Sequence, residues 1–357
     1  MKGITRMKKN PHAVRLDSII QFAKDGKFDA LMISNPANIQ ALTNLVCDNA
    51  TLLIRVGARQ KVTVKFYTDF RYIPMVHRLA PWLQVEDIRK IKFNADRIGC
   101  EYSMPYAKME ELSAEHPKAE FIDITKALYR TRAIKSPYEI DLIRKAEQLN
   151  CEIFVAAQQQ FVTGMTERDL ARLIKHLMID RGEGEAFETI VCVGKNAAEC
   201  HHIPDDTTWT GKEAVLVDMG VRLNGYCSDL TRNILPRRPS SFYREIYKLV
   251  LQANRAAIAA AQPGMTCGEL DAVARGIIEK AGYGKAFGHS LGHGVGVEIH
   301  ELPTARKKDD TILSPGMVVT IEPGIYLEGK LGVRIEDMIL ITQDGCECLS
   351  EMAEKNI

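Results

Sequence analysis

The sequence lacks the features of membrane, secreted and nucleic-acid-binding proteins. No apolar run reaches the roughly 20 residues that a membrane helix needs. The basic N-terminal stretch has neither the apolar core nor the small-residue cleavage site of a secretory signal. The 47 basic and 46 acidic residues leave a formal net charge of +1, which gives no electrostatic reason to expect nucleic acid or an anionic membrane surface. We therefore expect a cytoplasmic protein without nucleic-acid or membrane partners.

One sequence pattern of cysteine and one of histidine are also absent. The nine cysteines are an odd number and contain no C-x-x-C pair, which argues against a disulfide framework and against a zinc knuckle. His289 and His293 are four residues apart, but Ser290 stands where the zinc-protease pattern H-E-x-x-H has its glutamate. The surrounding stretch "AFGHSLGHGVGVEIHE" is too rich in glycine for a helix. Its alternation of apolar and polar residues from Gly294 onward predicts a strand instead.

The 357 residues are enough for one large domain or two of ordinary size. Residues 17–125 alternate helical and strand-like patterns, which favours a separate α/β domain. A strong helix start follows, with Ser136 and Glu139 forming an S-x-x-E capping box around Pro137 at the first helical position. We therefore predict an N-terminal α/β accessory domain over residues 1–130 and a second domain over residues 131–357.

The second domain contains a weak internal repeat. The segments "TGMTERDL" and "PGMTCGEL" begin at Thr163 and Pro263, and "GEGEAF" and "GYGKAF" begin at Gly182 and Gly282, always with an offset of 100 residues. Two matches in register favour a duplication. We predict an α+β domain built from two helix–helix–strand units packed face to face, with a ligand site at their interface.

Four carboxylates lie beside the apolar runs of this domain. Asp218 and Asp229 flank an Asn-Gly pair, the strongest short hairpin signal, and Glu322 and Glu336 flank the hairpin-like link "LEGKLG". Four such acids cannot all stay ionised without positive charge, and a metal cation is the simplest source. With one histidine added, the set suits Mn²⁺, Co²⁺ or Fe²⁺ better than a structural Zn²⁺ site. Four carboxylates also suffice for two metal ions that share bridging oxygens.

The motifs "VDMG…NGYCSDLTR", "GHSLGHGVG", "IEPGIY" and "GVRIED" occur in this order. Together they resemble the pita-bread metallopeptidases, specifically the proline-directed branch of aminopeptidase P and prolidase. The segments "NIQALTN" and "TDFRY" resemble the creatinase/prolidase-like N-terminal domain of that family. The resemblance implies a homodimeric metallo-exopeptidase with two divalent metal ions, Mn²⁺ in the first place and Co²⁺, Fe²⁺ or Zn²⁺ as alternatives.

The resemblance also implies roles for individual residues. Five of them would ligate the metals, with Asp229 and Glu336 bridging: Asp218, Asp229, His293, Glu322 and Glu336. Glu322 would in addition shuttle a proton between the attacking water and the departing nitrogen. His300 would sit over the scissile peptide and stabilise the tetrahedral intermediate.

Three further positions would face the substrate. His289 would line the pocket, and Arg334 would orient Glu336 or a substrate carboxylate. His201 matches a substrate-facing histidine of the family and would act in catalysis. Cys200 stands where the family commonly has proline, and His202 follows directly, so it stays open which imidazole faces the site.

Our leading expectation from the sequence is an Xaa-Pro aminopeptidase that acts on short peptides with proline in the second position. The alternative is an Xaa-Pro dipeptidase, or prolidase, which cleaves only the dipeptide. A methionine aminopeptidase is a weaker alternative because those enzymes usually lack the N-terminal domain. Non-peptidase members of the fold tend to lose metal ligands, whereas all five are present here.

Overall fold

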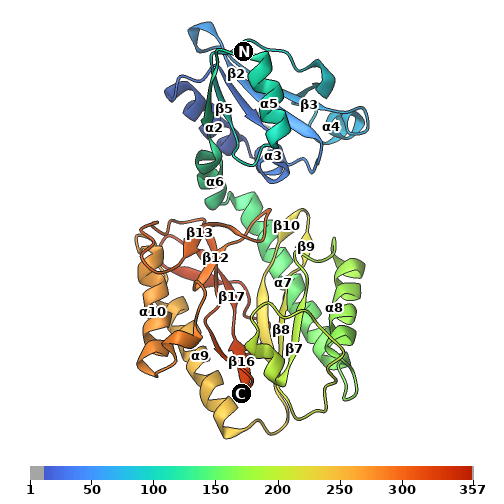
Figure 1. Cartoon of the computed structure of the whole chain (residues 1–357), viewed down its shortest axis with the longest axis vertical. Coiled ribbons are helices and arrows are strands. Elements are labelled where there is room, and N and C mark those ends of the chain that lie inside the picture. Colours follow the sequence, from blue (N-terminus) through green and yellow to red (C-terminus); the bar gives the residue numbers. More distant parts are fainter. Residues whose placement is uncertain (1–11, 356–357) are drawn as a thin grey trace. The chain divides into compact units, whose positions relative to one another are not determined.

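The computed structural model describes residues 12–355. The chain divides into two compact units between Arg132 and Ala133, and both are drawn in Figure 1. All nine cysteines lie in the described range and are free thiols. None of the helices in that range is long and apolar enough to cross a membrane.

The first unit is a mixed sheet flanked by helices, as the alternating pattern predicts. The strand order is β4-β3-β2-β1-β5-β6, with β1 antiparallel to β2 and parallel to β5. Two groups of buried apolar side chains pack here, one of them formed largely by α2, α3 and the central strands. The elements are β1 (Ala30–Ile33), β2 (Ala50–Val56), β3 (Val62–Thr68), β4 (Gln84–Asp87), β5 (Arg97–Cys100), β6 (Glu120–Asp123), α2 (Ala13–Asp25), α3 (Pro36–Thr43), α4 (Ile73–Leu79), α5 (Tyr106–Glu115), α6 (Thr125–Ala133) and the 3₁₀ turns η1 (Ala58–Gln60) and η2 (Ile88–Lys90).

The second unit has two pairs of long helices, one on each side of its strands (Figure 1). The first pair is α7 (Pro137–Gln160) and α8 (Glu167–Arg181), and the second is α9 (Ser241–Ala260) and α10 (Cys267–Lys280). The predicted capping box at Ser136 is present at the start of α7. Equivalent capping boxes begin α8 and α10, so side chains satisfy the first backbone N–H groups of these helices.

The strands of this unit form two sheets and two small hairpins. The sheets have the orders β11-β8-β7 and β13-β12-β14-β17-β18, and the hairpins are β9-β10 and β15-β16. The bounds are β7 (Ile190–Val193), β8 (Val215–Met219), β9 (Arg222–Leu223), β10 (Tyr226–Cys227), β11 (Leu230–Ile234), β12 (Gly292–Gly294), β13 (Glu301–Ala305), β14 (Val318–Ile321), β15 (Gly324–Leu327), β16 (Leu331–Arg334), β17 (Asp337–Ile341) and β18 (Cys346–Cys348), with 3₁₀ turns η3 (Gly194–Ala198) and η4 (Gly284–Ala286).

Matching hydrogen bonds confirm the predicted duplication. The backbone N–H of Gly164 donates to Trp209, and that of Gly264, one hundred residues on, donates to Leu313. Both glycines have a positive φ, +99° and +90°, which L-residues rarely adopt. The two halves therefore enter α8 and α10 through the same turn, held to an equivalent downstream segment.

The strand that we expected from Gly294 onward is wrong. Strand β12 ends at Gly294, and the chain bends before β13 begins at Glu301. The backbone N–H of Gly296 donates to the carbonyl of Glu298, which closes a local turn. A Cβ at Gly296 would lie 2.5 Å from the Glu301 carboxylate, so the alternating pattern reflects close packing in a bend rather than a pleated strand.

Candidate metal centre

The first pair of carboxylates meets on two neighbouring strands. Strand β11 pairs with β8 so that Thr231 lies opposite Asp218. Asp229 comes immediately before β11, after the chain has turned through the predicted β9-β10 hairpin. The interruption of the strand pair by a hairpin thus brings two acids eleven positions apart to one end of the β8/β11 ladder.

The second pair is built in the same way in the other half of the unit. Strand β14 pairs with β17, and Ile321 lies opposite Asp337. Glu322 directly follows Ile321 and Glu336 directly precedes Asp337, so the two acids lie next to each other at the same end of the β14/β17 pair. The β15-β16 hairpin connects them, as the sequence predicts.

His293 joins the two pairs from β12, which hydrogen-bonds with β14. Its Nε2 lies 3.5 Å from an Asp229 oxygen and 3.4 Å from a Glu322 oxygen. One ligand atom from each of Asp229, His293 and Glu336 lies within 4.8 Å of the others, a spacing at which one cation could be held. Burial, and then the neighbouring His300, lower the pKa of His293 to about 4, so the imidazole is neutral and free to ligate.

Two carboxylates of the cluster, Asp229 and Glu336, are buried and the other two are half-buried, with too little positive charge to balance them. Burial, followed by the charge of Glu336, raises the pKa of Asp229 well above its ordinary value. Burial likewise raises the pKa of Glu336, with Glu322 as the next cause, and raises that of Glu322 to about 8. Within the described part of the chain, Asp218 Oδ1 is buried without a hydrogen-bond partner. The donor set of oxygens and one imidazole, and this unsatisfied oxygen, fit divalent cations.

Arg334 is a cation that contacts the cluster directly, and its side chain is 4% exposed. It donates to Asp218 Oδ2 at 2.5 Å, to the Tyr326 hydroxyl at 2.9 Å and to Thr231 Oγ1 at 3.0 Å. The Thr231 hydroxyl in turn donates to Glu336 at 2.7 Å. Arg334 therefore orients Asp218 directly and Glu336 through Thr231, whereas contact with a substrate carboxylate stays a prediction.

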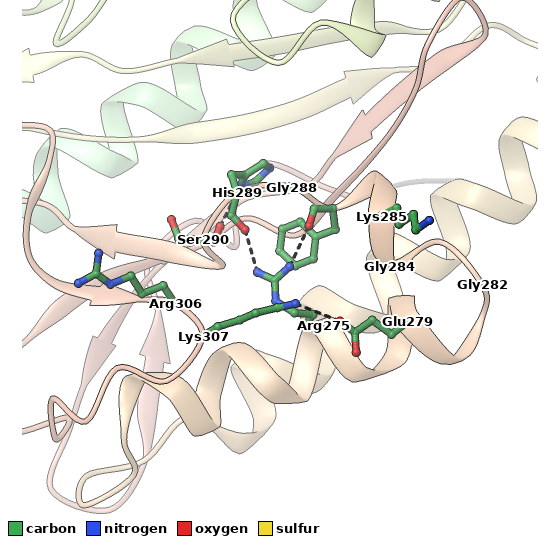
Figure 2. Close-up of a pocket in the computed structure, with 11 residues that line it drawn as sticks. Arg275, Glu279, Gly282, Gly284, Lys285, Gly288, His289, Ser290, Arg306 and Lys307 are labelled. Atoms are coloured by element: carbon green, nitrogen blue, oxygen red, sulfur yellow. Dashed lines mark hydrogen bonds and ion pairs between the residues drawn. The ribbon is translucent and has the colours of Figure 1, made fainter.

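His289 stands at the edge of the cluster. Its Nε2 lies 2.9 Å from the Tyr326 hydroxyl and its Nδ1 lies 2.8 Å from the Ser290 carbonyl. Figure 2 shows it at the border of a cavity of about 990 Å³, where Arg275 bonds to the carbonyl of His289 and to that of Phe287. The residues that line this cavity include none of the five proposed ligands, so the cavity is separate from the proposed metal site.

The three remaining histidines lie differently. The rings of His300 and His293 meet edge to face with centroids 4.3 Å apart. Burial, and then His201, lower the pKa of His300, and His201 also adds to the lowered pKa of His289, so His201 lies near both. His202 instead binds the buried Glu167 at 2.7 Å. The imidazole near the cluster is thus that of His201, and its role in catalysis stays a prediction.

Several supporting residues escaped the sequence reasoning. The backbone N–H of Asp229 donates to the wholly buried Glu147. Arg232 pairs with Asp337 at 2.8 Å, and Lys355 reaches the same carboxylate at 2.6 Å. Asp337 adjoins Glu336 in "GVRIED", which is the one signal that could have pointed to it. Lys355 and Arg232 therefore form an ion network around Asp337, and Arg232 also donates to the backbone carbonyl of the proposed ligand Glu336.

Comparisons with known proteins agree with this geometry. The model of metallopeptidase family M24 matches residues 141–343, and that of the creatinase/prolidase N-terminal domain matches residues 15–134. The Xaa-Pro dipeptidase of Pyrococcus furiosus is 35% identical over 348 residues, which cover 94% of this chain and 97% of the relative. The Xaa-Pro dipeptidase of Lactobacillus helveticus is 36% identical over 362 residues, with 93% and 95% covered. The solved prolidase from Pyrococcus furiosus superposes with a TM-score of 0.87 at 34% identity, covering 93% of this chain and 98% of that one.

These relatives correct one expectation. Relatives that align over almost their whole length are named Xaa-Pro dipeptidases, so the choice of Xaa-Pro aminopeptidase as the leading activity is wrong and its alternative is favoured. The motifs could not separate the two because they describe the metal site, which both activities would share. The α+β pita-bread fold with its N-terminal accessory domain is confirmed, as is the metallo-exopeptidase class. The chain belongs to metallopeptidase family M24.

Proposed function

We propose that this protein is an Xaa-Pro dipeptidase, which hydrolyses the bond between an N-terminal residue and a C-terminal proline. The observation that carries the proposal is the cluster of Asp229, His293 and Glu336, which Glu322 and Asp218 adjoin, in a chain that aligns over 93–94% of its length with proteins named Xaa-Pro dipeptidase. The Xaa-Pro bond is a tertiary amide, which many peptidases cannot accommodate, so a dedicated pocket has a chemical rationale.

We propose that the cluster holds two divalent cations, with Mn²⁺ favoured over Co²⁺, Fe²⁺ or Zn²⁺ by its oxygen-rich donors. The ligands would be Asp218, Asp229, His293, Glu322 and Glu336, with Asp229 and Glu336 shared between the ions. When bound, such cations lower the pKa of water and polarise a carbonyl group. Arg334 holds Asp218 in place for this task through their 2.5 Å contact.

The chain's own groups supply proton transfer and hydrogen bonding in this proposal. Glu322 lies at the cluster, with one oxygen 3.4 Å from His293 Nε2, and an ionised carboxylate at this place could both accept and return a proton. It would take the proton of the attacking water and deliver it to the proline nitrogen. His300 is neutral at pH 7 because its pKa is lowered, first by burial, and it would donate a hydrogen bond to the carbonyl oxygen.

The walls of the substrate site would come from two further histidines. The ring of His289 is held between Tyr326 and the Ser290 carbonyl and meets Phe287 edge to face, so its orientation is set before substrate arrives. His201 would approach the substrate from the opposite half of the duplicated unit. Preorganised side chains of this kind reduce the entropy that is lost on binding.

A matched pair of substrates tests the proposal. Metal-stripped enzyme would be assayed with Xaa-Pro and with Xaa-Pro-Xaa before and after Mn²⁺ is added, beside an Asp229→Asn control. We expect Mn²⁺-dependent cleavage of the dipeptide alone, with no activity in the control. Cleavage of the tripeptide at the bond before proline would contradict the dipeptidase assignment. Cleavage of neither peptide by metal-loaded enzyme would overturn the proposed function altogether.

The expected homodimer is a separate proposal that follows from the family. It rests on no contact within the chain, and sedimentation equilibrium of the purified protein would test it directly. A single species at the 40.0 kDa chain mass would contradict it. The cytoplasmic location likewise stays a prediction from the sequence.

A further inference from the structure

Glu167 is a buried carboxylate that the proposed reaction does not use. It is the first residue of α8 and has no exposed surface. Its two oxygens are contacted by four nitrogen groups within 3.0 Å, namely the backbone N–H groups of Val193 and Asp205 and the side chains of Asn196 and His202. One carboxylate thus ties together the end of β7, the turn η3 and the loop that follows it.

The second half of the duplicated unit has no counterpart to this arrangement. One hundred residues on, Cys267 begins α10 at the equivalent position and buries a thiol. The backbone bonds of the two positions still match, because Glu167 N–H donates to Thr207 and Cys267 N–H donates to Thr311. The carboxylate is therefore not needed for the shared turn, and its role concerns the loop that only the first half holds in this way.

That loop leads to the metal cluster. It contacts β16 through η3, and a Cβ at Gly332 would lie 1.7 Å from the Ala197 carbonyl oxygen, so the two backbones touch. Cys200 follows, and the nearby Tyr326 side chain is among the groups that influence the pKa of its thiol. The next residue, His201, is the imidazole that lies near His289 and His300.

His202 contacts Glu167 instead of the metal cluster. We call Glu167 and the four groups that contact its carboxylate the hub. Its Nε2 lies 2.7 Å from Glu167 and its Nδ1 lies 3.3 Å from Glu199, and Asp205 adds a third nearby negative charge. His201 lies in a turn in which the backbone N–H of the next residue, His202, donates to the carbonyl of Glu199. Fixing His202 at the end of this turn therefore limits the directions that the neighbouring His201 side chain can take.

We propose that Glu167 and His202 form a positioning pair that holds His201 towards the substrate of the dipeptidase. The proposal rests on the proposed function for the substrate itself, but not for the conformation of the loop. Without the pair, residues 199–205 gain backbone freedom, and substrate binding must then supply the entropy of ordering them. The pair acts on binding, so its loss is expected in KM more than in kcat and not in metal content.

The test compares two acid-to-amide variants of the same helix. Glu167→Gln places an amide N–H₂ group against N–H donors in the hub, whereas Asp169→Asn, in the exposed part of the α8 capping box, removes the same charge without contacting the loop. We expect Glu167→Gln to raise KM for Xaa-Pro about tenfold while kcat changes little, and Asp169→Asn to leave both near wild type. His202→Gln provides a second route to the same loss if Glu167→Gln fails to fold.

Two further measurements separate positioning from general damage. In a His201→Ala background, Glu167→Gln is expected to add no further loss, because the group that it positions is gone. Additive losses in that double variant would overturn the proposal. Hydrogen–deuterium exchange of residues 193–205, without substrate, is expected to speed up in Glu167→Gln and not in Asp169→Asn.

The exchange measurement distinguishes failure of this proposal from failure of the proposed function, since it requires no turnover. Unchanged exchange in Glu167→Gln would overturn the positioning role even if the enzyme is a dipeptidase. Glu167, His202 and Asp205 also lie close enough to hold a cation. If Glu167→Gln lost one equivalent of Mn²⁺ by elemental analysis, the hub would be a metal site and the positioning pair would be refuted.

Discussion

Removing the metals is expected to make the stability of this protein fall as the pH rises from 5 to 8. In the metal-free fold, the cluster buries Glu322 with Asp229 and Glu336, and the pKa of each is raised, first by burial. These carboxyl groups keep their protons in the folded chain at a pH where the unfolded chain has lost them. Each carboxyl group must either stay protonated or become a buried, unpaired charge, which lowers the free energy of unfolding.

The size of the effect follows from Glu322. Its pKa of about 8 exceeds the ordinary value of 4.5, and this difference is worth on the order of 5 kcal/mol, developed between those two pH values. In that window the folded state binds more protons than the unfolded state, so the free energy of unfolding decreases with rising pH. At pH 7 about nine-tenths of the Glu322 side chains remain protonated. Bound metal requires the ionised form and reverses the trend.

Urea unfolding of metal-free and Mn²⁺-loaded protein at several pH values between 5 and 8 would measure both trends. We expect the two stabilities to diverge steadily, with the metal-free form weakest at pH 8. Calorimetric titration with Mn²⁺ at pH 7 in buffers of different ionisation enthalpy should show release of about one proton or more. If metal-free protein became more stable with rising pH, or if metal binding released no proton, the electrostatic account of the cluster would be refuted.

Three other predictions concern residues around the cluster. Arg232→Met leaves Asp337 buried with one cation fewer, and urea unfolding should show a loss of roughly 3–5 kcal/mol, whereas an unchanged midpoint would refute the ion network. Gly332→Ala places a Cβ on the Ala197 carbonyl oxygen, so the melting temperature should fall and KM should rise. A melting temperature and a KM equal to those of the wild type would mean that the two backbones can separate freely. Asp229→Asn should bind fewer than two Mn²⁺ per chain by elemental analysis and lose activity with its fold retained by circular dichroism; full metal content would remove Asp229 from the ligand set.

Much of the fold and of the candidate site could be predicted because local rules determine it. The capping box at Ser136 and the offset of 100 residues between the two repeats reflect helix starts and turns whose causes lie within a few residues. The two hairpins were predictable for the same reason, and each one brings its pair of acids together. The bend at residues 295–300 was missed because its alternating residues are buried by distant neighbours and not by a strand partner.

The amino-acid sequence by itself thus determined the duplicated fold and the residue types of the metal site, since hydrophobic pattern, turns and donor chemistry are local properties. Only the tertiary structure decided which side chains form hydrogen bonds and ion pairs around the site. Arg334 meets Asp218 across 116 positions, and Glu167 meets His202 across 35. Such contacts depend on how whole strands and helices pack, because a side chain's partner is set by three-dimensional proximity and burial. No short pattern around either residue contains that information.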